Sequence, residues 1–126
     1  MKILCGTDII EVARIKESIE RSGDAFLNII YTPAEIEYCE SKKNAKYYHY
    51  AGRFAAKEAV VKALGTGFTE GISLKEIEIR NSKSGKPEVS LYGNAGRIFQ
   101  EIGGKKISLS ISHSDTDAVA FVVILL

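Results

Sequence analysis

Apolar residues in the first half of the chain recur with the period of helices. In the segment 11–22, Val12, Ile15 and Ile19 are three or four positions apart, which predicts a helix with one apolar face. A shorter helix is predicted over 25–30. Both follow an apolar stretch at the start of the chain that has the character of a strand. We therefore expect an opening strand followed by two short helices.

Thr32 and Pro33 mark the strongest helix start in the sequence. Thr32 is suited to cap the helix, Pro33 to occupy its first position, and Glu35 to complete a capping box. The longest helical pattern covers 47–64 and is followed by Gly65, a common helix stop. Because this segment is rich in alanine and apolar on almost every side, we expect it to be buried in the centre of the molecule.

The second half of the chain has short stretches in which apolar and polar residues alternate, a pattern typical of strands. Together with the opening segment, strands are expected at 2–10, 74–80, 88–92, 107–113 and 118–125. A short helix over 94–102 separates the two predicted hairpins. The prediction is a single α+β domain spanning residues 1–126, with the early helices packed on a largely antiparallel sheet.

Composition narrows the possible classes of function. The 126 residues are 45% hydrophobic and 26% charged, which is typical of a soluble globular protein and excludes a disordered or membrane-spanning chain. The net charge of +1 argues against a protein that wraps nucleic acid. The apolar run 118–126 has about half of the ~20 residues that a membrane helix needs, so it is expected to be a buried strand. Cys5 and Cys39 lack a metal-binding cluster, and no signal peptide is recognisable, so we expect reduced thiols in a cytoplasmic protein.

Asp8, Glu58 and Lys62 are the first candidates for chemistry. Glu58 and Lys62 are four residues apart on the long helix and project from one side of it, beside small alanines. An ordinary surface ion pair has the same spacing, so both interpretations stay open at this point. Asp8 is expected near the end of the first strand, where it either caps the next helix together with Glu11 or takes part in a site.

Arg53 and His113 add polar or positively charged groups. His113 is in phase with the apolar residues at the end of a strand, where a hydrogen-bonded core histidine is more common than a catalytic one. His49, set among tyrosines, is assigned a structural role. Two carboxylates on separate elements, accompanied by Lys62, Arg53 and His113, suit Mg²⁺ and a diphosphate. Magnesium takes one or two carboxylates and completes its coordination with water and phosphate oxygens.

These residues belong to motifs that together resemble the holo-acyl-carrier-protein synthases, the small single-domain 4′-phosphopantetheinyl transferases. The order and spacing of the motifs fit that family over essentially the whole chain, and the Phe-Ala-Ala-Lys-Glu-Ala block is the most specific of them. The motifs are Gly6-Thr7-Asp8-Ile9, Gly52-Arg53-Phe54-Ala55-Ala56-Lys57-Glu58-Ala59 with Lys62 and Gly65-Thr66-Gly67, Gly85-Lys86-Pro87, and Ser110-Ile111-Ser112-His113-Ser114.

The resemblance implies an enzyme that transfers the 4′-phosphopantetheine group of coenzyme A to a serine of apo acyl carrier protein. Adenosine 3′,5′-bisphosphate would be released, and the reaction would support fatty acid biosynthesis. Asp8 and Glu58 correspond to the magnesium ligands of the family, and Lys62 to a lysine beside the reacting diphosphate. The attacking hydroxyl belongs to the carrier, and its proton goes either to a metal-bound water or to a carboxylate such as Glu58. Members of the family are typically homotrimers with active sites between subunits.

The resemblance also assigns residues to the two substrates. Arg14 corresponds to a carrier-binding position, and Arg21 shares its helix face. Asn28 and Tyr31 depart from the family pattern, which bears on the strength or angle of carrier docking. The residues expected to bind coenzyme A are Arg53, Lys62, Gly65, Thr66, Lys86, Pro87, Ser112 and His113.

Two other functions remain open at this point. One is a module that binds coenzyme A or a nucleotide without turnover, or a subunit of a larger assembly. The other is a different Mg²⁺-dependent phosphoryl-transfer enzyme that acts on a nucleotide. The acids Asp8 and Glu58 favour the transferase over the module, because a module that only binds has no need of two converging acids. Neither a nucleic acid nor a membrane is expected as a partner.

Overall fold

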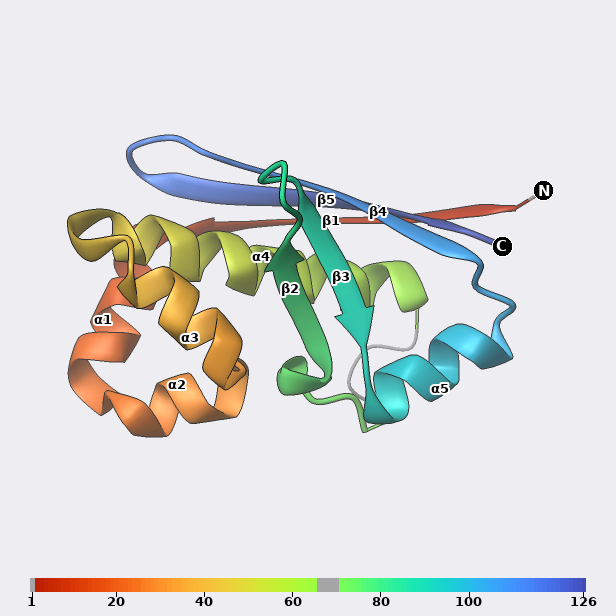
Figure 1. Cartoon of the computed structure of the whole chain (residues 1–126), viewed down its shortest axis with the longest axis horizontal. Coiled ribbons are helices and arrows are strands. Elements are labelled where there is room, and N and C mark those ends of the chain that lie inside the picture. Colours follow the sequence, from red (N-terminus) through yellow and green to blue (C-terminus); the bar gives the residue numbers. More distant parts are fainter. Residues whose placement is uncertain (1, 66–70) are drawn as a thin grey trace.

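The first and last strands of the chain lie side by side in one sheet (Figure 1). The computed structural model describes residues 2–65 and 71–126. Its helices are α1 (Val12–Ser22), α2 (Asp24–Ile30), α3 (Pro33–Glu40), α4 (Lys46–Leu64) and α5 (Gly93–Glu101), with short 3₁₀ helices at Lys43–Ala45 and Leu74–Glu76. Its strands are β1 (Ile3–Glu11), β2 (Ile77–Asn81), β3 (Pro87–Leu91), β4 (Lys106–His113) and β5 (Asp117–Leu125).

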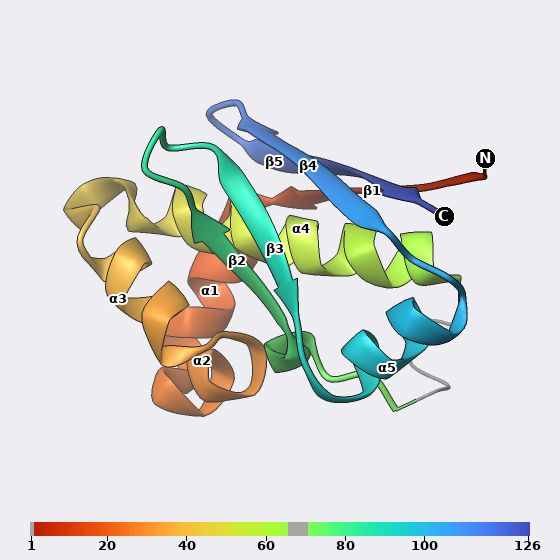
Figure 2. The same ribbon diagram turned by 45° about the vertical axis from the view of Figure 1, so that its right-hand side comes forward.

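Strands β1, β5 and β4 form an antiparallel sheet in that order. The pairing of β1 with β5 runs from Ile3 opposite Leu125 to Glu11 opposite Asp117. Strands β2 and β3 form a separate antiparallel hairpin. Figures 1 and 2 show α4 beneath the larger sheet and the other described helices on that same side. The outer face of this sheet is therefore not covered by any described helix.

The alanine-rich helix α4 is the centre of the core. Ala55, Ala56, Ala59 and Val60 are completely buried. The helix ends at Gly65, whose φ of 83° is the left-handed conformation that glycine adopts without strain. The prediction of a buried central helix is confirmed, with one more residue at its start than expected.

Helix α3 begins with the predicted capping box, which leads into a buried ion pair. The Thr32 hydroxyl accepts from the Glu35 backbone N–H, and the Thr32 N–H donates to Glu35 Oε1 at 2.8 Å. The same carboxylate lies 2.7 Å from Lys57 Nζ on α4, with both side chains fully buried, and accepts a hydrogen bond from the Ile79 N–H of β2. Removing one partner would leave a buried charge unpaired, at a cost of about 3–5 kcal/mol. The pair therefore ties α3, α4 and β2 together.

Strand β1 continues further than expected, which excludes the alternative in which Asp8 caps the next helix. Asp8 lies inside the strand opposite Ala120, and α1 begins after Glu11, whose side chain makes no capping hydrogen bond. The Val12 N–H instead donates to the Thr116 carbonyl at 2.8 Å. The residues from Asp8 to Glu11 pair with β5 instead of starting the helix. Each residue added to the sheet in this way satisfies its backbone hydrogen-bonding groups.

The remaining elements follow the predicted order, with shifts at their ends. Residues 74–76 form a 3₁₀ helix rather than the start of a strand, because Ser73 and Glu76 close a capping box there. Cys39 is buried and Cys5 is exposed, and both are free thiols. Within residues 2–65 and 71–126, no helix combines the length and apolar character needed to cross a membrane.

Candidate active site

Strand β1 crosses helix α4 at very close range because residue 6 is a glycine. A Cβ atom on Gly6 would lie 2.1 Å from the Ala59 carbonyl oxygen and 2.8 Å from the Ala63 nitrogen, which no side chain tolerates. Side chains alternate along a strand, so Asp8 is on the same face as Gly6. The close crossing therefore brings the Asp8 carboxylate to α4.

Asp8, Glu58 and Lys62 meet at this crossing, and we call them the acid–lysine cluster. Lys62 Nζ donates to Asp8 Oδ1 and to the Thr7 carbonyl oxygen, both at 3.0 Å. Glu58 is half-buried one helical turn before Lys62. Burial raises the pKa of Glu58, the negative charge of Asp8 raises it further, and Lys62 lowers it. The three charges therefore act on one another, although they come from distant parts of the sequence.

The acid–lysine cluster has the donors that a magnesium ion uses. Asp8 and Glu58 offer carboxylates from different elements, and the raised pKa of Glu58 reflects in part the repulsion between two acids. Among the residues that the structure describes, no three or more His, Cys, Asp or Glu side chains surround a metal-sized space. A Mg²⁺ ion held by these two acids would take its other oxygens from water or substrate phosphates, which is its usual coordination.

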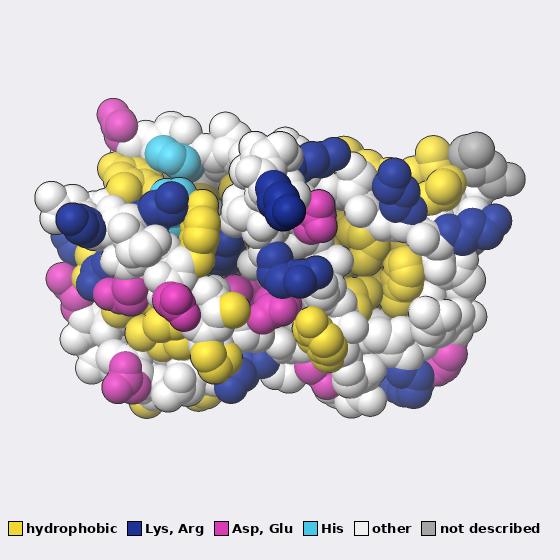
Figure 3. Space-filling view, viewed as in Figure 1, with side chains coloured by type: hydrophobic (Ala, Val, Ile, Leu, Met, Phe, Trp, Pro, Cys, Tyr) yellow, Lys and Arg dark blue, Asp and Glu magenta, His cyan; other side chains and the backbone are white. Residues whose placement is uncertain are grey.

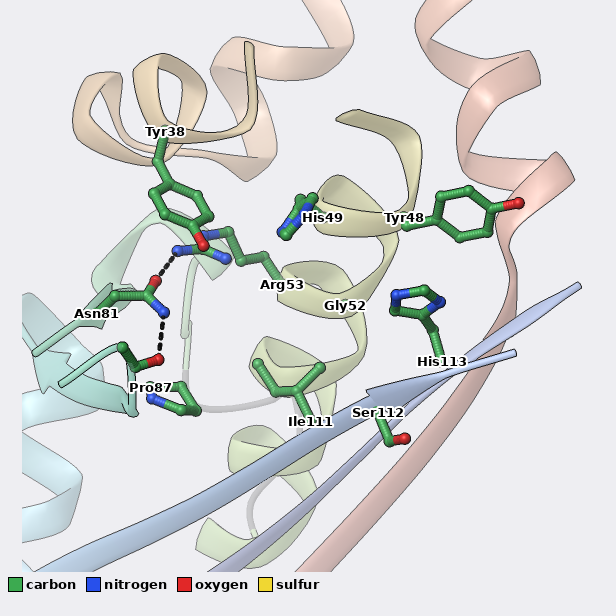
Figure 4. Close-up of a pocket in the computed structure, with 11 residues that line it drawn as sticks. Tyr38, Tyr48, His49, Gly52, Arg53, Asn81, Pro87, Ile111, Ser112 and His113 are labelled. Carbon is green, nitrogen blue, oxygen red and sulfur yellow. Dashed lines mark hydrogen bonds between the residues drawn. The ribbon is translucent and has the colours of Figure 1, made fainter. Parts of the chain in front are cut away.

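A cavity of about 200 Å³ opens near the beginning of α4, and we call it the Arg53 cavity (Figure 4). Its walls come from α3, the first half of α4, the turn between β2 and β3, and the end of β4. It is lined by Tyr38, Tyr48, His49, Gly52, Arg53, Asn81, Gly85, Pro87, Ile111, Ser112 and His113. None of these residues is acidic, whereas three carry a guanidinium or an imidazole. The cavity is therefore suited to an anion with a flat or apolar part.

The Arg53 guanidinium is held in a fixed orientation in the cavity wall. The residue is 5% exposed, its Cζ lies 4.0 Å from the centre of the Tyr38 ring, and Nη2 donates to Asn81 Oδ1 at 2.6 Å. Asn81 in turn donates to the Gly85 carbonyl at 2.9 Å. Among the described residues, Arg53 Nε finds no hydrogen-bond partner and no acid forms an ion pair with Arg53. A buried guanidinium with unused donors is a preformed anion site.

The structure brings Pro87, Ser112 and His113 to the same cavity as Arg53. The His113 ring stacks on Tyr48 with 4.8 Å between ring centres. His113 is exposed at the end of β4, so it is not the buried core histidine that its apolar neighbours indicated as the commoner alternative.

Of the described residues expected to bind coenzyme A, Lys62, Gly65 and Lys86 do not line this cavity. Gly65 lies at the opposite end of α4, where its N–H donates to the Lys62 carbonyl. Lys86 borders a neighbouring groove together with Lys106. Thr66 lies outside the described residues.

The acid–lysine cluster and the Arg53 cavity face different sides of α4. Arg53 and Lys62 are nine residues apart, which at 3.6 residues per turn is two and a half turns and points their side chains in opposite directions. No residue of the cluster lines the cavity. Within one chain, the groups suited to a cation and those suited to an anion therefore do not meet.

Arg14 and Arg21 line a separate hollow between α1, α2 and α4. Both arginines are exposed, and the apolar rings of Phe26 and Phe54 lie in the same hollow. Phe54 is four residues before Glu58, so it lies on the side of α4 that bears the acid–lysine cluster. The arginine hollow thus adjoins the cluster rather than the Arg53 cavity.

Of the two departures from the family pattern, only Asn28 reaches the surface. Tyr31 is completely buried, and its hydroxyl donates to the Tyr50 carbonyl at 2.8 Å. Tyr31 is therefore part of the core and offers no surface to a carrier.

Sequence reasoning missed Tyr38 and Asn81, and it assigned His49 a structural role. Tyr38 and Asn81 belong to α3 and β2, and only tertiary packing brings them to Arg53. His49 could have been found, because it lies four residues before Arg53 on one helix face. The same spacing relates Phe54 to Glu58 and could have identified the apolar part of the arginine hollow.

Comparison with known proteins decides the family. Residues 4–122 match the model of the 4′-phosphopantetheinyl transferase superfamily. The chain belongs to this superfamily. A curated relative from the superfamily, the holo-[acyl-carrier-protein] synthase of Ruminiclostridium cellulolyticum, is 52% identical over 98% of this chain and 92% of the relative. The holo-[acyl-carrier-protein] synthase of Koribacter versatilis is 48% identical over 94% of each chain.

Solved structures lead to the same superfamily. The chain is similar to the holo-[acyl-carrier-protein] synthase of Neisseria meningitidis, with a TM-score of 0.87, 35% identity and 98% of each chain covered. It is also similar to the Helicobacter pylori enzyme solved in complex with coenzyme A, with a TM-score of 0.85, 33% identity, and coverage of 97% of this chain and 100% of that one. The family resemblance and the α+β fold expected from the sequence are confirmed.

Proposed function

We propose that this chain transfers the 4′-phosphopantetheine group of coenzyme A to a serine of an apo acyl carrier protein. The serine oxygen forms a bond to the phosphorus of the phosphopantetheine, and the bond to the bridging oxygen breaks. The electron pair of that bond leaves with adenosine 3′,5′-bisphosphate. The observation that carries the proposal is the meeting of Asp8, Glu58 and Lys62 at one crossing, in a chain of this superfamily. The names of the relatives and the coenzyme A complex of one of them support the two substrates.

Asp8 and Glu58 are the proposed ligands of Mg²⁺, which when bound would neutralise negative charge on the diphosphate. Lys62 Nζ, already in contact with Asp8, would add a positive charge beside the leaving phosphate. Glu58 is half-buried beside the charge of Asp8, so its carboxylate is placed to accept a proton within the cluster. Glu58 is therefore also our candidate to take the serine proton.

The Arg53 cavity is the proposed binding site of the adenosine bisphosphate part of coenzyme A. The unused donors of Arg53 and the exposed His113 ring support contacts to phosphate, and Tyr48 and Pro87 offer flat surfaces to the remainder. Ser112 is a further proposed contact in the same wall. Lys62, Gly65, Thr66 and Lys86 are assigned to coenzyme A by their correspondence to the family motifs.

The arginine hollow is the proposed docking surface for the carrier, which in this family is acidic. Arg14 and Arg21 are exposed and line the same hollow as the apolar rings of Phe26 and Phe54. A negatively charged helix that also has an apolar residue would fit such a surface. The hollow adjoins the acid–lysine cluster, so a docked carrier would present its serine close to the proposed metal ligands.

We further propose that the enzyme is a homotrimer, because this would reunite the two separated sites. The outer face of the larger sheet has large apolar side chains that are 37–66% exposed, and an apolar sheet face of this kind is typical of a subunit interface. These side chains are Ile3, Ile9, Val119 and Phe121. In the trimer, the acid–lysine cluster of one protomer would lie beside the Arg53 cavity of its neighbour. One coenzyme A molecule would then contact both.

The decisive experiment is incubation with coenzyme A, Mg²⁺ and an apo acyl carrier protein, followed by intact-mass analysis of the carrier. We expect the carrier to gain one phosphopantetheine group and adenosine 3′,5′-bisphosphate to appear in equal amount. Binding of coenzyme A without release of the bisphosphate would favour a module that only binds. ATP turnover without modification of any carrier would favour a different phosphoryl-transfer enzyme. We also propose that the activity serves fatty acid biosynthesis in the cytoplasm.

A further inference from the structure

His49 lies in the wall of the Arg53 cavity, four residues before Arg53 on the same face of α4 (Figure 4). Its ring packs edge-on against Tyr38, with 5.6 Å between the ring centres and 77° between the planes. The same Tyr38 ring also supports the Arg53 guanidinium. The imidazole and the guanidinium therefore share one aromatic support and face one space. Figure 3 shows histidine side chains at the surface near Lys and Arg side chains, so a ligand from solvent can reach them.

The charged groups that act on His49 are positive or become positive on protonation. Lys42 acts from the segment before α4, Arg53 from α4 itself, and His113 from the end of β4, while Tyr38 adds a neutral ring from α3. Burial is the largest cause that lowers the pKa of His49, and these cations lower it further. Near neutral pH, His49 is therefore mostly uncharged as long as the cavity holds no anion.

We propose that His49 is a specificity-determining residue that gains a proton when a phosphate-bearing ligand enters the Arg53 cavity. The proposal rests on the function proposed above, in which this ligand is the adenosine bisphosphate part of coenzyme A. A phosphate beside Arg53 offsets the field of the surrounding cations, so the imidazolium becomes favourable. The charged ring then adds an attraction that the free cavity lacks.

Selectivity follows from this change of charge. A ligand without the phosphate leaves the cationic surroundings of His49 unchanged, so the ring stays neutral and contributes no ionic attraction. A ligand with the phosphate gains affinity as the pH falls toward the pKa of the free imidazole. If the bound phosphate raised the pKa by one unit, the affinity gained at low pH would approach roughly tenfold. His49 therefore makes the preference for phosphorylated ligands stronger in mildly acidic solution than in alkaline solution.

The test is calorimetry with adenosine 3′,5′-bisphosphate on the wild-type protein and on His49→Gln, at pH 6.5 and pH 8.5. Each titration is run in two buffers with different heats of ionisation, which yields the number of protons taken up. At pH 6.5 we expect the wild type to take up more protons and to bind about threefold more tightly than the variant. At pH 8.5 the two affinities should be equal.

A second measurement is made on the wild-type protein and does not rely on the His49→Gln variant. In the wild-type protein, NMR titration of the His49 ring should give a higher pKa with the bisphosphate bound than without it. The same titration in His113→Gln assigns the signal to His49, because only two histidines are present in the chain. Equal proton uptake by the wild type and His49→Gln, or a His49 pKa that does not rise, would overturn the proposal and leave the proposed function standing. Failure of the wild type to bind the bisphosphate at either pH would overturn both.

Discussion

The acid–lysine cluster and the Arg53 cavity lie on one helix but are built in opposite ways. In the cluster, charges of both signs meet at a crossing that Gly6 permits, and the Lys62 side chain is 55% exposed. In the cavity, the described lining has no acid, and Arg53 is held by a ring and an amide. The cluster combines two acids with one cation, whereas the cavity offers only cationic and neutral side chains. The difference indicates that cation and anion recognition are separated on one chain.

The largest effect is expected when the cluster loses a carboxylate. Asp8→Asn removes the charge with little change in shape, and we expect kcat/KM for carrier modification to fall by at least about 100-fold, because a proposed Mg²⁺ ligand is lost. The measurement is the rate of mass gain of the carrier at several Mg²⁺ concentrations. Glu11→Gln, on the opposite face of the same strand, is the control and should keep its activity. Full activity of Asp8→Asn would contradict the metal assignment.

The second prediction concerns the trimer that would bring the two regions together. Phe121→Glu places a charge on the outer sheet face, where Phe121 is 48% exposed. The variant should be monomeric by light scattering and at least about tenfold less active, because the groups that position coenzyme A are separated. Ile29→Glu, on α2 and 68% exposed, should leave the oligomeric state unchanged. A monomer with wild-type activity would show that each chain works alone.

A moderate effect is expected in the Arg53 cavity. Arg53→Lys keeps the charge but loses the planar group that Tyr38 and Asn81 hold, so binding of adenosine 3′,5′-bisphosphate should weaken by about tenfold. Calorimetry at pH 8.5 measures the change with His49 uncharged, and the carrier KM should stay the same. Arg80→Lys, exposed on β2, is the matched control. Unchanged affinity in Arg53→Lys would remove Arg53 from the binding site.

A smaller effect is expected at the arginine hollow, on the side of the cluster. Arg14→Glu should raise the carrier KM by about three- to tenfold at low salt and by less at high salt, since exposed charges are screened. The KM for coenzyme A should not change. Lys105→Glu alters the net charge equally between α5 and β4, which do not line the hollow, and its carrier kinetics should match the wild type. If Arg14→Glu had the same carrier kinetics as the wild type, the proposed docking surface would be wrong.

The smallest effect concerns stability and its dependence on pH. Burial and the charge of Asp8 raise the pKa of Glu58, so the folded state favours the protonated form, and stability is lost as the pH rises through that pKa. In EDTA, Glu58→Gln should therefore have a higher Tm than the wild type at pH 7, and the gain should vanish below the unfolded glutamate pKa of roughly 4.3. Thermal denaturation across this range measures it. A lower Tm for the variant at pH 7 would contradict the unfavourable burial of the charge.

The sequence predicts features set by neighbouring residues well, and contacts between distant segments poorly. The helix start at Thr32 and the helix stop at Gly65 were predicted correctly, because capping and left-handed turns depend on residues close in the chain. The sequence left open whether Asp8 caps a helix or takes part in a site, and the structure places it inside strand β1. Its partner strand β5 is at the other end of the chain, and no local pattern reveals that pairing.

The sequence by itself determined that Glu58 and Lys62 share a side of α4, and that Arg53 points the opposite way, because helical periodicity sets side-chain directions without any partner. Only the tertiary structure decided which groups meet these side chains. Asp8 reaches Lys62 because Gly6 lets two backbones touch, and Tyr38 and Asn81 reach Arg53 because α3 and β2 pack beside α4. Such contacts depend on how whole elements pack around one core, which no short stretch of sequence encodes.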